Sequence, residues 1–228
     1  MTVSAESLPE TDRLEQIYET IKARICTNEI GPGALIFETQ IAEEYGVSRT
    51  PIRRIFARLE HDGLIRTRRG VGSYATALDV ETVNDCYELR VHLSELIGDN
   101  VDRSAVAGTI ERLEDLGRRA SMLHDKVDYA AIGEVNIGVM RAILNSIRNQ
   151  PLRDTLESLY MRTTRVWHAA IPDLDWAQEV DMVQAEINEL LRALRVGDLM
   201  TYGHVRRNFT SLAQRRLMDR RSAEGPGR

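Results

Sequence analysis

The feature that most restricts the fold is a glycine turn between two short helical patterns, within residues 39–61. Thr39 has the side chain of an N-cap for a brief first helix, and Gly46 ends that helix. Ser48 caps the second helix, and Pro51 is tolerated in its first turn because no intrahelical N–H bond is lost there. The apolar residues of the second helix recur at i, i+3, i+4 and i+7, as Ile52, Ile55, Phe56 and Leu59. This arrangement predicts a helix-turn-helix.

The segments on either side extend this motif to a small domain over residues 11–77. An amphipathic helix comes before it, with apolar residues three and four positions apart at Leu14, Ile17, Tyr18, Ile21 and Ile25. The breaker at 31–33 ends that helix, and residues 35–37 are expected to form a short strand. Two further strands are expected at 64–68 and 71–75. The domain is therefore predicted to be a winged helix-turn-helix with a small β-hairpin as its wing.

Positive charge is concentrated on the same segment. Residues 49–69 hold seven arginines and two acidic residues, although the whole chain has a net charge of −5. At about 100° per residue, Thr50, Arg53 and Arg54 lie opposite the apolar stripe, and Arg49 lies near its boundary. Arginine pairs with guanine O6 and N7 or with phosphate, so this face suits the major groove of DNA. A single arginine could serve solubility alone, but the whole cluster on an outward helix face favours DNA binding.

Four runs of this segment carry a family resemblance: IYETIK at 17–22, GPGAL at 31–35, GVSRTPIR at 46–53 and LEHDGLI at 59–65. They resemble the winged-helix domain of the GntR family of bacterial transcription regulators. With that resemblance, the candidate DNA-binding residues are those of the second helix and the wing tip: Ser48, Arg49, Thr50, Arg53, Arg54, Arg69 and Gly70. Arg54 and Phe56 stand where the family usually has Glu and Leu. The extra cation leads us to expect a shifted base preference.

From residue 78 to 220 the pattern is almost wholly helical. Helices are expected at 80–101, 109–123, 126–146, 149–170, 175–196 and 198–220. Asn149 with Pro151, and Asp175 with Gln178, have the residue types of helix N-termini. Six helices with short links predict an antiparallel bundle, so the fold class is mainly α. Residues 221–228 contain Gly-Pro-Gly and are expected to be a disordered tail.

A helical unit of this size after a GntR-type domain resembles the FCD domain of the FadR subfamily, as do the fragments YELR at 87–90 and LRVGD at 194–198. The resemblance implies a homodimer, an effector pocket inside the bundle and a ligand-controlled affinity for DNA. Many members hold a divalent metal there through one Asp and three His. The corresponding positions here are Asn136, Met140, Ile187 and Phe209. Thioether, alkyl and phenyl groups do not replace imidazole, so we expect no metal and no cofactor.

The sequence leaves open what takes the place of the metal. The apolar side chains at 140, 187 and 209 favour either a more apolar effector or a pocket filled by side chains. Arg90 is our candidate for pairing with an effector carboxylate, with an exposed or helix-capping role as the alternative. His168 and His204 are interpreted as ordinary core or surface histidines.

Together these patterns predict a ligand-responsive, sequence-specific DNA-binding regulator, most often a repressor in the resembled family. We expect it to bind an inverted-repeat operator in double-stranded DNA as a homodimer and to respond to a small organic or more apolar carboxylic acid. The alternative is a regulator with a filled pocket, constitutive or controlled by a protein partner. A helical enzyme is a remote alternative, because the helical segment has no G-x-S-x-G or H-E-x-x-H motif.

Cellular location is predicted from what the sequence lacks. No uncharged run approaches the roughly 20 apolar residues of a spanning helix, so a membrane partner is not expected. The first ten residues have no signal-peptide pattern. Cys26 and Cys86 lie far apart and suggest neither a disulfide framework nor a zinc cluster. We therefore expect a cytoplasmic protein that associates with the nucleoid when it is bound to its operator.

Overall fold

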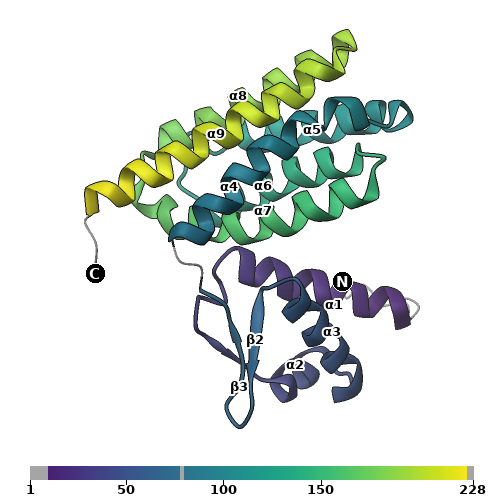
Figure 1. Ribbon diagram of the computed structural model, residues 1–228, viewed down its shortest axis with the longest axis vertical. Helices are drawn as coiled ribbons and strands as arrows, with labels where there is room; N and C mark the ends of the chain where they lie inside the picture. The colour runs from purple at the N-terminus through teal and green to yellow at the C-terminus, as the bar shows by residue number, and fades with distance from the viewer. Residues whose placement is uncertain (1–9, 78–79, 225–228) are drawn as a thin grey trace. The chain divides into compact units, whose positions relative to one another are not determined.

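The computed structural model describes residues 10–77 and 80–224 of the chain (Figure 1). The chain divides into two compact units, residues 1–78 and 79–228, which we call the N-terminal unit and the helical unit. Helices dominate both units, and the strands are confined to a small sheet in the first, so the mainly α fold class is confirmed.

The N-terminal unit combines three helices with a three-stranded sheet. Its elements follow the order α1 (Glu10–Cys26), β1 (Leu35–Ile36), α2 (Glu38–Tyr45), α3 (Arg49–His61), β2 (Ile65–Arg68) and β3 (Gly72–Ala75). All pairings are antiparallel in the order β1-β3-β2, with Leu35 opposite Tyr74 and Arg66 opposite Tyr74 on the other side. The expected hairpin wing is therefore extended by a third strand. The core is formed by the inward residues of all three helices: Ile17, Ile21, Ile25, Ile41, Ile52, Ile55, Phe56 and Leu59.

The turn between α2 and α3 follows the predicted pattern except at one cap. Gly46 has φ 61° and its N–H bonds to the carbonyls at the end of α2, which is the left-handed C-cap that glycine favours. Ser48 occupies the N-cap position of α3, although its side chain makes no capping hydrogen bond. The prediction that Thr39 caps the first of these helices is wrong. Phe37 holds that position because its extended backbone already starts the helix at Glu38.

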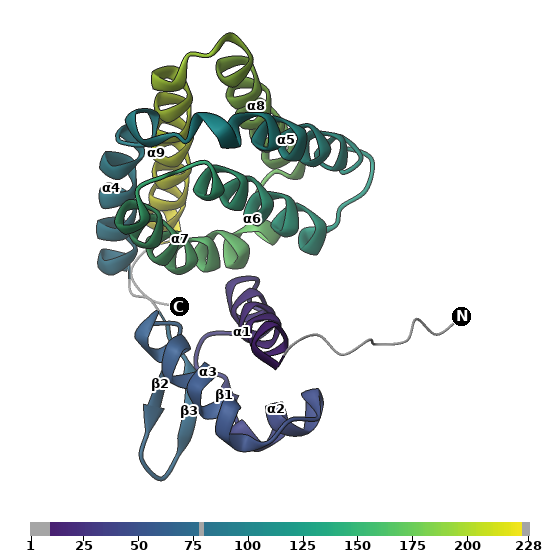
Figure 2. The same cartoon turned by 90° about the vertical axis from the view of Figure 1, so that its right-hand side faces the viewer.

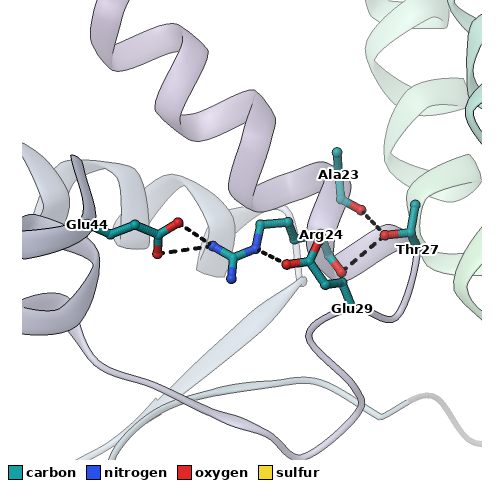
Figure 3. A network of polar contacts seen from close by, with 5 residues as sticks. All are labelled: Ala23, Arg24, Thr27, Glu29 and Glu44. Carbon is teal, nitrogen blue, oxygen red and sulfur yellow. Dashed lines mark hydrogen bonds and ion pairs between the residues drawn. The ribbon is translucent and has the colours of Figure 1, made fainter. Parts of the chain in front are cut away.

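An ion-pair network ties the end of α1 to α2 (Figure 3). Arg24 Nε lies 2.7 Å from a carboxylate oxygen of Glu29, and Arg24 Nη1 lies 3.0 Å from one of Glu44. Thr27 Oγ1 donates to the carbonyl of Ala23 one turn earlier. One guanidinium thus links α1, the loop that follows it and α2. The contact supports the packing of the helix-turn-helix from a residue outside that motif.

The helical unit contains six α-helices in its described part, as the sequence predicts. They are α4 (Val80–Glu95), α5 (Val106–Ser121), α6 (Tyr129–Asn145), α7 (Gln150–Ala170), α8 (Trp176–Val196) and α9 (Leu199–Glu224), with short 3₁₀ turns at Gly98–Asn100, Arg103–Ala105 and Ile171–Asp173. Helix α4 packs beside α9 and α7, and α5 packs beside α8 and α6 (Figure 2). The predicted caps are confirmed at α7 and α8, where Asn149 and Asp175 accept bonds from Leu152 and Gln178 backbone N–H groups.

Two predicted helix ends are wrong by four residues or more. The first helix of the unit ends at Glu95 rather than 101, because Gly98 lies where α9 crosses: a Cβ there would be 2.6 Å from the Leu199 carbonyl oxygen. Gly203 makes the reciprocal approach, since a Cβ at that position would be 2.8 Å from the Gly98 nitrogen. The last helix continues to Glu224, so residues 221–224 do not belong to a disordered tail. Residues 225–228 lie outside the described part of the chain.

Candidate nucleic-acid interface and buried cavity

Helix α3 carries its arginines on the face opposite the core. Arg49 and Arg53 have side chains 57% and 64% exposed, and Thr50 and Arg54 are exposed as well. The four apolar residues of the same helix are buried. An outward arginine face on the second helix of a helix-turn-helix has the geometry for entering the major groove. The arrangement of these residues is therefore the one that the sequence periodicity predicts.

A glutamate on α2 contacts this arginine face. Glu38 Oε2 lies 3.0 Å from Arg53 Nε and 3.6 Å from Arg49 Nη2. Both pairs are partly open to solvent, so phosphate or a guanine edge can replace the carboxylate at little cost. The sequence pattern did not single out Glu38. An acidic residue in the first turn of a helix is a weak signal, because only the packing of α2 on α3 brings it to the arginines.

The wing supplies further cations at the turn between β2 and β3. Arg66, Arg68 and Arg69 are exposed, and neither they nor Arg54 form an ion pair with any residue that the structure describes. Gly70 forms the tip with φ 79°, a left-handed conformation that side chains rarely adopt. The backbone N–H of Thr67 donates to Glu60 at 2.8 Å, which attaches β2 to the end of α3.

Arg58 belongs to the same positive segment but has a structural role. Its Nη1 lies 2.6 Å from Glu15 Oε2, and its guanidinium lies 3.5 Å from the centre of the Tyr18 ring. Tyr18 in turn donates to Asp62 at 2.5 Å, and burial together with this bond raises its pKa. Arg58 therefore fastens α3 to α1 and is not available for a nucleic acid in the way that Arg53 and Arg54 are.

The helical unit contains a partly open cavity of about 60 Å³. It lies among α4, α6, α7, α8 and α9, and its lining includes Tyr87, Arg90, Asn136, Tyr160, Thr164, Trp167, Glu179, Glu186, Arg206 and Phe209. Three of the five predicted effector positions line it, namely Arg90, Asn136 and Phe209. Met140 and Ile187 are almost completely buried in the core and are not part of the lining. The cavity is consequently more polar than the sequence positions suggested.

Two carboxylates and two guanidinium groups face this cavity. Arg206 Nη1 lies 2.5 Å from Glu186 Oε1, and both side chains are buried. Glu179 accepts a hydrogen bond from Trp167 Nε1 at 2.9 Å and pairs with Arg216 at 2.5 Å. Burial disfavours the charge of Arg206, but the attraction of Glu186 outweighs that and raises its pKa. Each of the two carboxylates therefore has a guanidinium partner within the protein.

Arg90 is the exception among these charged groups. Its Nη1 donates to Thr163 Oγ1 at 2.6 Å, and its guanidinium lies 5.0 Å and 5.1 Å from the ring centres of Tyr87 and Tyr160. No carboxylate of the described residues forms an ion pair with it. Burial, and then repulsion from Arg206, lowers the pKa of Arg90 to about 10. The alternative of an exposed Arg90 is wrong, because the residue is 4% exposed on the inner face of α4.

The residues at the family's metal positions do not fit a metal. Asn136 and Phe209 face the cavity, Met140 and Ile187 lie in the core, and only the Asn136 amide has an oxygen donor. Within residues 10–77 and 80–224 there is no group of three or more His, Cys, Asp or Glu placed to hold an ion.

The two histidines considered from the sequence lie away from this lining. His168 is buried on α7, and burial lowers its pKa to about 4. Its ring fills the space left by Gly133 of α6, where a Cβ would be 2.1 Å from His168 Cε1. His204 is exposed on α9. His168 is thus a core histidine whose Nε2 is buried without a hydrogen-bond partner among the described residues, and His204 is a surface histidine.

Comparison with known proteins identifies the N-terminal unit. Residues 13–74 match the family model described as bacterial regulatory proteins, gntR family. The HTH-type transcriptional regulator YdhC of Bacillus subtilis is 30% identical over 146 residues, which are 62% of this chain and 64% of that protein. An HTH-type regulator of Agrobacterium vitis is 33% identical over 40% of this chain and 53% of its own length. The chain thus spans less than two thirds of these relatives. The matched segment is a GntR-family helix-turn-helix domain.

Solved structures share the whole fold. The chain is similar to Escherichia coli McbR/YncC, with a TM-score of 0.74 at 20% identity over 96% of this chain and 99% of that one. A structure described as a GntR transcriptional regulator of Rhodococcus sp. RHA1 gives a TM-score of 0.70 at 18% identity over 91% and 98%. The Bacillus and Agrobacterium relatives are both described as HTH-type transcriptional regulators. In the described part of the chain, no helix is long and apolar enough to cross a membrane.

Proposed function

We propose that this chain, with its GntR-family helix-turn-helix domain, is a transcription regulator that binds operator DNA and releases it in response to a small organic acid. The observation that carries the proposal is the exposed arginine face of α3, set on a domain that matches the family model over residues 13–74. Ser48, Arg49, Thr50, Arg53 and Arg54 contact the major groove, and Arg69 and Gly70 of the wing reach the minor groove.

The regulator acts as a homodimer on an inverted repeat. A single recognition helix reads one half-site, and two copies reading successive major grooves provide the specificity of an operator. We assign dimerisation to the helical unit, in keeping with its resemblance to the FCD domain of the FadR subfamily. The protein works in the cytoplasm, where it has access to the nucleoid.

The effector binds in the cavity of the helical unit without a metal. Arg90 provides the cationic group, with Asn136 and Phe209 beside it. Arg90 belongs to α4, the helix that follows directly on residues 78–79 after the N-terminal unit. A ligand that binds Arg90 competes with the hydrogen bond from Arg90 to Thr163 on α7. The ligand therefore acts on α4, the first helix after the DNA-binding domain. The ligand shifts the population between conformations with different DNA affinity.

Selection of bound sequences from a random DNA library tests the proposal, with wild type and Arg53→Ala compared at near-physiological salt. We expect wild type to enrich an inverted repeat and Arg53→Ala to lose or relax it. Arg112→Ala, an exposed arginine of α5, is the matched control and is expected to behave as wild type. Failure of wild type to enrich any sequence would contradict the proposal.

A further inference from the structure

Among the charged groups around the cavity, one cation has no carboxylate partner. Arg206 is neutralised by Glu186, and Glu179 is neutralised by Arg216 and further held by Trp167. Arg90 remains as a buried cation that donates to the Thr163 hydroxyl and pairs with no carboxylate of the described residues. A guanidinium has five N–H donors in a fixed planar arrangement, and burying its charge without a counter-ion is costly. The faces of Tyr87 and Tyr160 offset part of that cost.

A second polar group of the lining has no hydrogen-bond partner among the described residues. Thr164 Oγ1 is buried and forms no hydrogen bond within the described residues, although the Thr164 side chain lines the cavity. Buried hydroxyls are normally satisfied by protein, water or ligand. An oxygen-bearing ligand on Arg90 supplies an acceptor or donor for this hydroxyl within the same small space. Two independent observations therefore indicate a ligand in this cavity.

In the resembled family a divalent metal ion is held in this part of the helical domain. Here the protein has a cationic side chain, Arg206, in that region. Arg206 lies on α9 one turn before Phe209, and Glu186 on α8 directly precedes Ile187. The guanidinium thus occupies the same stretch of the two helices as two of the expected metal ligands. A divalent ion would add two positive charges next to Arg90 and Arg206, while the nearby carboxylates are already engaged. The charge pattern opposes such an ion.

The dimensions of the cavity limit its occupant. A volume of about 60 Å³ is roughly four to six times the ~10–15 Å³ that one enclosed water requires. Such a space suits a molecule of about four to six non-hydrogen atoms. One of its ends must carry charge to meet Arg90, and the rest meets the aromatic side chains of Trp167 and Phe209.

We infer that the cavity binds one small monocarboxylate on Arg90 directly, without a metal, and discriminates against dicarboxylates. The single uncompensated guanidinium matches one negative charge, whereas a second carboxylate would face Glu179 and Glu186 in a desolvated space. The inference rests on the proposed function, because it names the class of acid that the regulator senses. It adds the charge selectivity and the independence from divalent ions.

The test is isothermal titration calorimetry on the full-length protein after dialysis against a chelator. Propionate and butyrate are the monocarboxylate probes, oxalate and malonate the dicarboxylates, and propionamide the neutral analogue; oxalate has the same number of non-hydrogen atoms as butyrate, so this pair differs in charge and not in size. We expect saturable binding of a monocarboxylate, binding of the dicarboxylates at least tenfold weaker, and none of propionamide. Addition of Zn²⁺ or Mn²⁺ is expected to leave the affinity unchanged.

Two variants identify the binding group. Arg90→Gln is expected to weaken the monocarboxylate at least tenfold, whereas Thr163→Val, of nearly the same shape, is expected to tighten it severalfold by removing the competing hydroxyl. Arg195→Gln changes an exposed arginine of α8 and serves as the control. Thr163→Val keeps the inference falsifiable if Arg90→Gln does not fold, as judged by circular dichroism.

Several results would overturn the inference: equal or tighter binding of dicarboxylates, binding that requires a divalent ion, binding of propionamide, no saturable binding of either monocarboxylate, or no effect of Arg90→Gln. The DNA selection reports on the regulator independently. If an inverted repeat is enriched but no monocarboxylate binds, the present inference fails and DNA binding stands. If neither is observed, both proposals fail.

Discussion

Arg53 and Arg206 each pair with a glutamate, but one pair lies at the surface of the N-terminal unit and the other inside the helical unit. The Arg53–Glu38 pair is 3.0 Å long with side chains 64% and 28% exposed. The Arg206–Glu186 pair is 2.5 Å long with side chains 6% and 10% exposed. An exposed pair contributes little and exchanges readily with an outside anion, whereas a buried pair fixes the structure. The same residue types thus serve binding in one unit and the architecture of a cavity in the other.

The largest expected effect on stability comes from breaking the buried Arg206–Glu186 pair. Glu186→Gln leaves Arg206 charged and unpaired in the interior, so we expect the free energy of unfolding to fall by about 3–5 kcal/mol in urea titrations. Glu114→Gln breaks the exposed 2.7 Å pair with Arg195 and is the control, with an expected loss below about 1 kcal/mol. Similar losses for both variants would show that burial does not separate the two kinds of pair.

The exposed arginines are expected to affect DNA binding without affecting stability. Arg54→Ala should weaken operator binding by about 1–3 kcal/mol if Arg54 contacts a base, or lower the salt slope by about one unit if it contacts phosphate. Fluorescence anisotropy at several salt concentrations separates these outcomes. The melting temperature should stay unchanged, since Arg54 forms no ion pair within the described residues. An unchanged affinity and slope would remove Arg54 from the interface.

His168 extends the comparison to pH. Because burial lowers the pKa of His168 from 6.5 to about 4, the unfolded chain binds a proton at that position before the folded protein does. Stability is therefore expected to be constant with respect to this group above pH 6.5 and to fall by about 2 kcal/mol as the pH drops from 6.5 to 5. Denaturant unfolding over this range measures it. His168→Gln should flatten the slope, and the exposed His204→Gln should not.

The smallest expected effect belongs to Glu38. Glu38→Gln should change the free energy of unfolding by less than about 1 kcal/mol, because the pairs with Arg49 and Arg53 are exposed. Removal of the carboxylate also frees both arginines for any phosphate. Binding to non-specific DNA should therefore strengthen more than binding to the operator, in competition experiments. If Glu38→Gln instead increases the ratio of operator affinity to non-specific affinity, Glu38 does not orient these arginines.

The sequence alone was sufficient for elements that local periodicity and capping define. The apolar stripe of α3 determines both the buried face and the outward face, so the periodicity by itself places Arg53 and Arg54 on the outside. Gly46, Asn149 and Asp175 likewise mark helix ends through contacts within four residues of themselves. The prediction of Thr39 as an N-cap was wrong because the preceding residue, Glu38, is already the first residue of the helix.

The features that only the tertiary structure decided involve residues far apart in the chain. The end of α4 at Glu95 depends on the close approach of Gly98 to α9. The absence of Met140 and Ile187 from the cavity lining depends on which faces of α6 and α8 point toward the cavity. Glu38 meets Arg53, and Arg90 is left without a carboxylate among the described residues, only because the helices pack as they do. A sequence specifies which residues share a helix face through its short period, but the partner of each buried charge is chosen by packing between helices.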